Sequence, residues 1–146
     1  MNVDAYPNDK TQCSQHWSPE DTPNFQVVNA EKMPFEDEQF TEVIARHCLE
    51  HMENPLQALR EMHRVCSGKV RVWIPSQWKK DYSPRHLYAW SPVELENLMR
   101  KAGFASAKAS YTRRVYRWTS RKTTLVNLIV KLFGFYTEIY GEGTKW

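Results

Sequence analysis

The sequence predicts a single α/β domain over residues 1–146, with helices on both faces of a mostly parallel sheet. Short apolar segments of strand length alternate with amphipathic segments that carry helix-capping residues, and this alternation is typical of parallel sheets. Hydrophobic residues make up 41% and charged residues 25% of the chain, as in ordinary globular proteins. The length fits one domain with a real core, although it is short for a complete α/β enzyme.

Three apolar segments predict strands in the first half of the chain, at Phe25–Val28, Thr41–Ala45 and Val70–Ile74. Pro75 ends the third strand. A polar, proline-containing loop is expected at residues 7–24, and a second loop at residues 31–39.

Helix-capping residues mark two helices. Asn54 is a suitable N-cap before Pro55, and the Ser67-Gly68 pair is expected to stop this first helix. The second helix begins at Ser91, with Glu94 completing a capping box, and ends at Gly103. The tail is expected to form a strand over 106–118, a helix over 123–133 and a last strand over 136–140.

Several classes of protein are excluded. No apolar run reaches the roughly 18 residues that cross a membrane, and the N-terminus shows no signal-peptide pattern, so we expect a cytoplasmic protein. Three cysteines without a CxxC pair do not indicate a disulfide framework. Residues 1–64 hold 5 Lys+Arg against 12 Asp+Glu, and residues 65–146 hold 15 against 5. The arginine-rich run near residues 113–122 is best explained as a solvated edge, so nucleic acid is not the expected partner.

Four motifs in order resemble class I S-adenosylmethionine-dependent methyltransferases of the type 11-like group. Residues 29–55, NAEKMPFEDEQFTEVIARHCLEHMENP, look like that family's run from its third strand through the turn after its fourth. ALREMHRV at residues 58–65 is similar to its Glu-x-x-Arg-Val helix, and HLYAWSPVELENLMRKAGF at residues 86–104 to its helix ending in Ala-Gly-Phe. Asn2-Val3-Asp4 matches the end of its second strand. The resemblance implies a Rossmann-like sheet of order 3-2-1-4-5-7-6.

The resemblance also implies a site for S-adenosyl-L-methionine. Asp4 stands where the family's acidic residue accepts the ribose hydroxyls, and Asn29 with the backbone of Ala30 stands where adenine is bound. Arg46 and His47 leave the fourth strand and face the methionine end of the cofactor. If the nucleophile arrives protonated, His47, His51 or His86 is the candidate general base.

The sequence departs from the family pattern at its N-terminus. No glycine precedes Gly68, so the family's first strand and its glycine-rich loop have no match, and we expect an N-terminally truncated domain. Gly141-Glu142-Gly143 is a GxG string near the C-terminus with no helix after it, and it does not indicate a nucleotide loop. Thr41 and Asn29 replace residues that are usually Asp in the family.

The histidines allow several interpretations. His47 and His51 lie four residues apart beside Cys48 and Glu50, so a metal site is conceivable, but HCLEH is not HExxH. Because no third ligand has diagnostic spacing, the sequence predicts no metal site. A structural or substrate-facing role for His51 is favoured over an acid/base role.

These observations leave more than one function open. The first hypothesis is methyl transfer from S-adenosyl-L-methionine to a small-molecule or sugar-type acceptor, by a chain that is a fragment of the full enzyme. The alternative is a non-catalytic binding module that has kept the fold and lost the cofactor loop. Loss of the first strand leaves an apolar strand edge near Val43. This edge could pair with the Asn2–Val3 segment, be covered by a second copy of the chain, or stay open if the N-terminal residues detach; of these we expect the second, a homo-oligomer.

Overall fold

The computed structural model describes residues 2–4, 25–76, 86–112 and 138–146. The predicted loop at 7–24, the predicted helix at 123–133 and the predicted strand beyond residue 112 lie outside these ranges. No helix in the described ranges is long and apolar enough to span a membrane.

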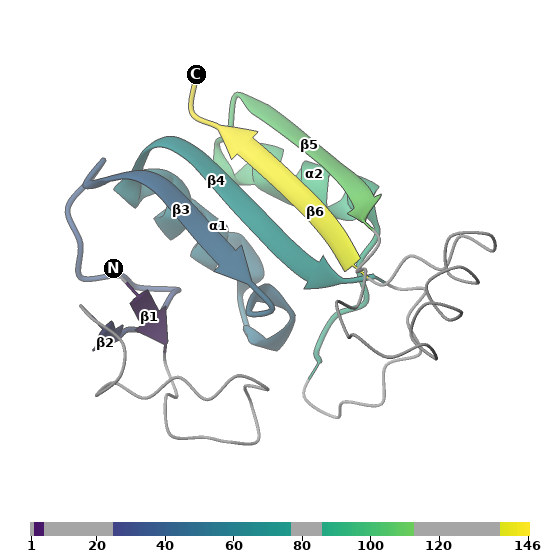
Figure 1. The fold of residues 1–146 in the computed structure, drawn as a ribbon, viewed down its shortest axis with the longest axis horizontal. Helices are drawn as coiled ribbons and strands as arrows, with labels where there is room; N and C mark the ends of the chain where they lie inside the picture. The colour runs from purple at the N-terminus through teal and green to yellow at the C-terminus, as the bar shows by residue number, and fades with distance from the viewer. Residues whose placement is uncertain (1, 5–24, 77–85, 113–137) are drawn as a thin grey trace, which may run out of the picture.

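A four-stranded mixed sheet forms the centre of the described structure (Figure 1). Its strands are β3 (Phe40–Arg46), β4 (Cys66–Pro75), β6 (Glu138–Thr144) and β5 (Ser106–Thr112), in the order β3-β4-β6-β5. This is the 4-5-7-6 order that the resemblance implied, and it confirms an α/β, Rossmann-like sheet. The sheet is mostly parallel, as expected: β3, β4 and β5 run in one direction. Only β6, which lies between β4 and β5, is reversed and pairs antiparallel with both.

Both capped helices form as predicted. In α1 (Pro55–Val65) the Asn54 side chain accepts a hydrogen bond from the backbone N–H of Gln57 at 3.0 Å. In α2 (Pro92–Ala102) the Ser91 hydroxyl accepts from the backbone N–H of Glu94, and the Glu94 carboxylate accepts from that of Ser91 at 2.7 Å. Each of these bonds satisfies an N–H that the first turn of a helix leaves unpaired.

The end of α1 differs from the prediction. The helix ends at Val65 and β4 begins at Cys66, so Ser67 and Gly68 belong to the strand rather than to a helix stop. A side chain at Gly68 would overlap the carbonyl oxygen of Thr41 on the neighbouring strand. The glycine therefore allows β3 and β4 to approach closely, which a reading of Gly as a helix terminator overlooks.

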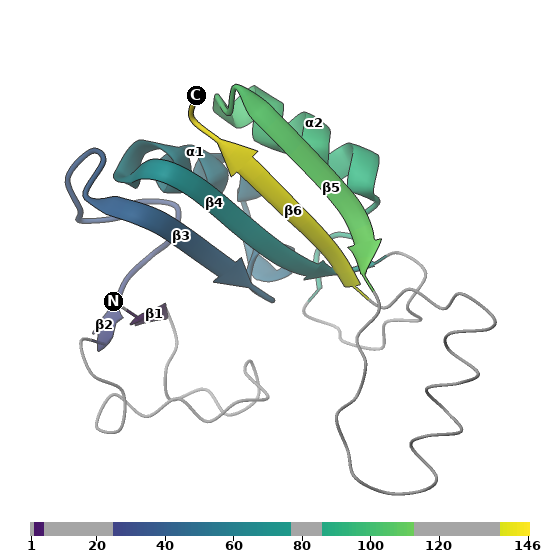
Figure 2. The same cartoon turned by 45° about the horizontal axis from the view of Figure 1, so that its top comes forward.

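The core lies between the sheet and the two helices. α1 and α2 contact each other and cover the same face of the sheet, as both views show (Figures 1 and 2). Alternate residues of the strands point into this layer and are buried together with one face of each helix; the fully buried members include Leu59, Val70, Val72, Ile74, Leu95, Met99 and Ile139. The predicted helices of the second face have no counterpart in the described ranges.

The last described strand extends further than predicted. The sequence indicated a strand ending at Tyr140, but β6 continues to Thr144 and includes Gly141 and Gly143. A Cβ atom at Gly141 would lie 2.6 Å from Leu95 Cδ2, and one at Gly143 would lie 2.7 Å from Met99 Cε. The GxG string is therefore a packing feature that lets α2 approach the sheet.

The opposite face of the sheet carries charged residues. Arg71 on β4 pairs with Glu42 on β3 at 3.0 Å and with Glu142 on β6 at 3.3 Å. The Tyr140 hydroxyl donates a hydrogen bond to Glu142 at 2.6 Å. Cross-strand pairs of this kind hold the register of the three strands.

A separate parallel pair precedes the main sheet. β1 (Asn2–Asp4) pairs with β2 (Phe25–Val27), and both views place this pair on the side of β3 away from β4 (Figures 1 and 2). Within the described ranges no strand pairs with the outer edge of β3. Ile44 on β3 is 59% exposed, and Val27 on β2 is 62% exposed.

Candidate functional site

Polar side chains gather where the parallel strands β3 and β4 end. β3 ends at Arg46, and β4 ends at Pro75, which pairs in register with Glu138 at the start of β6. Because β6 runs antiparallel to β4, its first residue lies at this same edge. Open α/β sheets bind ligands at the carboxyl ends of their strands, so this edge is the candidate site.

His47 connects the end of β3 to β6. Its backbone N–H donates to the carbonyl of Trp73 at 2.8 Å, and its φ of 50° turns the chain sharply out of the strand. Its Nε2 lies 2.8 Å from a Glu138 carboxylate oxygen, and its Nδ1 lies 3.4 Å from Oε1 of Glu50. The imidazole therefore lies between two carboxylates.

The two carboxylates determine the charge of His47. The Glu50 carboxylate has the largest influence; it and the Glu138 carboxylate raise the pKa of His47 above its usual range, against the lowering effect of burial. A raised pKa favours the charged form of the imidazole, which adds positive charge at this edge of the sheet.

Glu50 is an unusual residue for its position. It is 1% exposed, and neither of its carboxylate oxygens has a hydrogen-bond partner in the described structure. The 3.4 Å contact with His47 is too long for a good hydrogen bond and acts as an ion pair. A buried carboxylate without hydrogen bonds is costly, and such groups are found where function requires them.

His51 and His86 meet beside Glu50. Their ring centroids are 4.7 Å apart in an edge-to-face arrangement. The backbone N–H of Leu87 donates to the carbonyl of Glu50 at 2.8 Å, and the Tyr88 hydroxyl donates to that of Glu53 at 2.9 Å. These bonds hold the segment of His86 against the short helix η1 (Leu49–His51). The structure therefore brings together all three predicted histidines.

The residues predicted for the adenosine end lie on the separate strand pair and the loop after it. Asp4 is level with Val27 in the register of β1 and β2, so the backbone places Asp4 close to the segment that continues to Asn29. Asn29 is exposed, and its side-chain oxygen accepts a hydrogen bond from the backbone N–H of Glu31 at 2.8 Å. The side chain of Asp4 lies outside the described part of the structure.

Arg64 on α1 holds the loop that follows Asn29 in place. The Arg64 guanidinium donates to the carbonyls of Phe35 at 2.7 Å and Met33 at 3.0 Å. It also pairs with Asp37 at 2.8 Å and with Glu61 at 2.9 Å. These bonds explain the Glu-x-x-Arg spacing of the motif at residues 58–65, because one helical turn places Glu61 beside Arg64.

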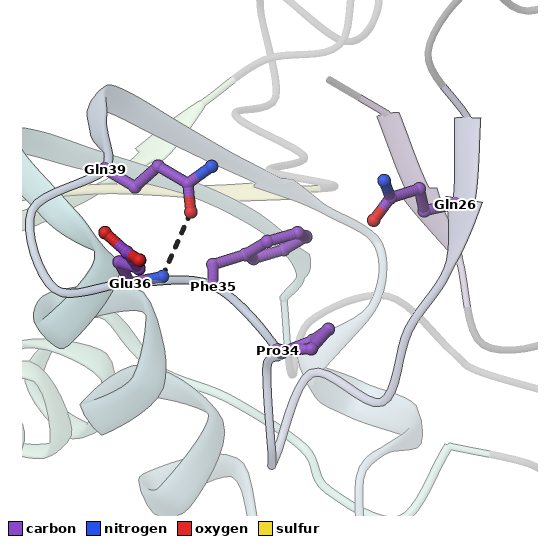
Figure 3. Close-up of a pocket in the computed structure, with 5 residues that line it drawn as sticks. All are labelled: Gln26, Pro34, Phe35, Glu36 and Gln39. Carbon is purple, nitrogen blue, oxygen red and sulfur yellow. Dashed lines mark hydrogen bonds between the residues drawn. The ribbon is translucent and has the colours of Figure 1, made fainter.

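A shallow pocket lies between β2 and the same loop. Its volume is about 440 Å³, and Figure 3 shows Gln26 facing Phe35 and Gln39 across it. The Gln39 side chain accepts a hydrogen bond from the backbone N–H of Glu36 at 3.0 Å (Figure 3). This pocket lies beside the open edge of β3, away from the histidines.

Comparison with known proteins identifies the family. The family model described as a methyltransferase domain matches residues 1–74. Ajmaline N-methyltransferase from Rauvolfia serpentina is 35% identical over 80 residues, which cover 55% of this chain and 27% of that protein. The chain therefore belongs to the methyltransferase-domain family, and it spans about a quarter of the length of this relative.

Solved structures support the fold. A complex of the Haloferax volcanii Trm112 methyltransferase activator with a methyltransferase has a TM-score of 0.65 at 16% identity, covering 83% of this chain and 61% of that one. Phosphoethanolamine N-methyltransferase 2 from Haemonchus contortus, bound to S-adenosyl-L-methionine, has a TM-score of 0.60 at 14% identity. The match covers 83% of this chain and 36% of that one. At these identities the likeness shows a shared fold.

Sequence reasoning missed one group at the site. No sequence motif pointed to Glu138. It begins the last strand, and this tail of the chain resembles the family only in its general strand–helix–strand pattern. Glu50 belongs to the Leu-Glu-His motif, but the sequence did not reveal that its carboxylate is buried. Arg46 is exposed at the end of β3, as predicted for a residue leaving the strand.

Proposed function

We propose that this chain forms part of a longer enzyme that transfers a methyl group from S-adenosyl-L-methionine to a small-molecule or sugar-type acceptor. One observation carries the proposal. In a member of the methyltransferase-domain family, three histidines and two buried carboxylates gather at the carboxyl ends of β3 and β4. This is the edge where ligands of open α/β sheets bind.

The residues expected to hold the adenosine part of the cofactor have suitable chemistry. An amide side chain such as Asn29 offers both a donor and an acceptor to the adenine edge, and its oxygen keeps a second lone pair beside its bond to Glu31. Asp4 would accept the ribose hydroxyls, and the Ala30 backbone would contact the ring. When bound, S-adenosyl-L-methionine supplies an electrophilic methyl group on its sulfonium.

At the other end of the cofactor, Arg46 and His47 would provide positive charge for the methionine carboxylate. The raised pKa of His47 favours the charged form that this role needs, and its two carboxylate partners hold the ring in place. His51 and His86 are then the histidines placed to receive a proton from the acceptor. Most of the catalysis would come from alignment of the reacting groups.

The acceptor class is tested most directly by a methyl-transfer assay. A longer form of the protein, beginning upstream of Met1, would be incubated with methyl-labelled cofactor and a panel of small amines and sugars. Amines belong in the panel because two of the proteins named above are N-methyltransferases. We expect transfer to at least one small acceptor.

Substitution at His51 would show whether the histidine pair takes part. If His51 is a general base, His51→Ala should lower turnover by roughly 10²–10⁴-fold with little change in melting temperature, whereas a structural histidine should lower the melting temperature and leave turnover nearly intact. His63→Ala is the matched control, since His63 packs on Phe104 away from the site. A longer form that binds cofactor but methylates no acceptor would favour the alternative, a non-catalytic binding module.

We also propose that copies of the chain associate through the open edge of β3. No described strand pairs with the backbone groups along the outer edge of β3, and the exposed Ile44 adds apolar surface to this strand. The contrast in charge between residues 1–64 and 65–146 favours contact between copies.

A further inference from the structure

Three metal-binding side chains converge at the site although the sequence predicted no metal. Glu50, His51 and His86 each offer one ligand atom, and these three atoms lie within 4.8 Å of one another. The sequence lacked a third ligand at diagnostic spacing because His86 lies on a distant segment. The fold supplies it, through the hydrogen bond from the Leu87 backbone to the Glu50 carbonyl.

The charge balance around Glu50 favours a bound cation. Glu50 is 1% exposed and Glu138 5% exposed, and the two carboxylates share one imidazole, that of His47. The shorter contact, 2.8 Å, goes to Glu138. Glu50 has the longer contact, 3.4 Å, and is therefore the weaker hydrogen-bond partner of this imidazole. Oε2 of Glu50 is buried without a hydrogen bond, so a cation would relieve a real cost.

We infer that Glu50, His51 and His86 bind a divalent transition-metal ion of the zinc class. Two imidazoles and one carboxylate are a common donor set for such ions, whereas magnesium and calcium prefer all-oxygen sites. In a tetrahedral zinc site the ligand atoms lie about 3.4 Å apart, given bond lengths of about 2.0–2.1 Å. Small side-chain rotations from the present spacing would therefore close the site.

The ion would leave a coordination position open. Three protein ligands on a four-coordinate ion are the pattern of catalytic rather than structural zinc sites. A hydroxyl or amine bound there would lose its proton more readily. His51 and His86 would then act as ligands rather than as bases. Binding of the metal does not depend on the proposed function, because it needs neither cofactor nor acceptor.

The test is titration of the full 146-residue chain, stripped with a chelator, with Co²⁺ and then Zn²⁺. We expect one equivalent of Co²⁺ to bind with visible absorption of a four- or five-coordinate ion, and Zn²⁺ to displace it. His51→Ala and His86→Ala should each weaken binding by about 100-fold or more, since even the partners behind metal ligands contribute 10–100-fold. Glu50→Gln, which keeps the side-chain shape, should weaken it similarly.

The controls separate this site from other metal-binding groups. His63→Ala should bind Co²⁺ as the unchanged chain does, because His63 lies against Gly103 and Phe104. Circular dichroism confirms that each variant is folded, and if Glu50→Gln unfolds, the two histidine variants carry the test. Failure to bind Co²⁺, equal binding by the His51 and His86 variants, or strong sulfur-to-cobalt charge transfer from cysteine ligation would each overturn the inference.

Discussion

Replacing Arg64 with alanine should destabilise the fold through the loop that follows β2. The guanidinium donates to the carbonyls of Met33 and Phe35 and pairs with Glu61 and Asp37. These charged partners also raise the pKa of Arg64, so it stays protonated at any pH where the protein is folded. The variant removes every one of these bonds at once.

The structure sets the size of the effect. The ion pair with Asp37, which is 75% exposed, contributes little, since exposed pairs are worth about 0–1 kcal/mol. The two carbonyl bonds are partly buried, and each is worth about 1 kcal/mol after allowing for the 31% exposure of the Arg64 side chain. Adding the partly buried Glu61 pair, we expect Arg64→Ala to lower the free energy of unfolding by about 2–3 kcal/mol.

Urea denaturation measures this change. Arg60→Ala is the matched control, because Arg60 is exposed one turn earlier on α1, and it should change stability by less than about 0.5 kcal/mol. Arg64→Lys should recover only part of the loss, since an ammonium group lacks the planar fork that reaches several acceptors. Equal stability of the Arg64→Ala and Arg60→Ala variants would show that the Arg64 bonds to the loop do not stabilise the fold.

Three further predictions follow from the sheet. Gly68→Ala should lower the melting temperature in a thermal scan, because its Cβ would overlap the Thr41 carbonyl; an unchanged melting temperature would contradict the close approach of β3 and β4. The hydrogen bond from Tyr140 lowers the pKa of Glu142 in the folded chain. The ionised Glu142 therefore stabilises the fold above the usual Glu pKa of about 4.3, and this stabilisation is lost as the pH falls through the lowered pKa of the folded state. In urea titrations at several pH values, Glu142→Gln should reduce the loss of unfolding free energy at acid pH. An equally steep loss in the variant would contradict the role of Glu142. Light scattering should show association that rises with concentration and weakens in Ile44→Lys, whereas a monomer at all concentrations would exclude the open edge as an interface.

The sequence predicted best where local chemistry decides the structure. The caps at Asn54 and Ser91 fixed the starts of both helices, because each cap satisfies backbone groups within a few residues. It predicted less well where long-range packing decides. Gly68 was interpreted as a helix stop, and the Gly141-Glu142-Gly143 string was given no structural role. Gly68 and Gly141 nevertheless both permit contacts with distant elements.

The candidate site shows the same division. The family motifs identified His47, His51 and His86, but their grouping with the buried Glu50 and Glu138 depends on how segments far apart in sequence pack. Burial of a carboxylate is a property of the folded chain, and no spacing signal reports it. The family motifs therefore predicted which residues lie at the site, whereas the fold sets their partners and raises the pKa of His47.

The central claim is that this chain provides part of an S-adenosyl-L-methionine site, and calorimetry with the demethylated product, S-adenosylhomocysteine, tests it most directly. The chain lacks any glycine before Gly68, so alone it should bind weakly or not at all, while a longer form beginning upstream of Met1 should bind at micromolar concentration. Asp4→Ala in the longer form should reduce affinity by roughly 1.5–3 kcal/mol, the value of hydrogen bonds to a charged group. Absence of binding by the longer form, or full affinity in its Asp4→Ala variant, would contradict the account.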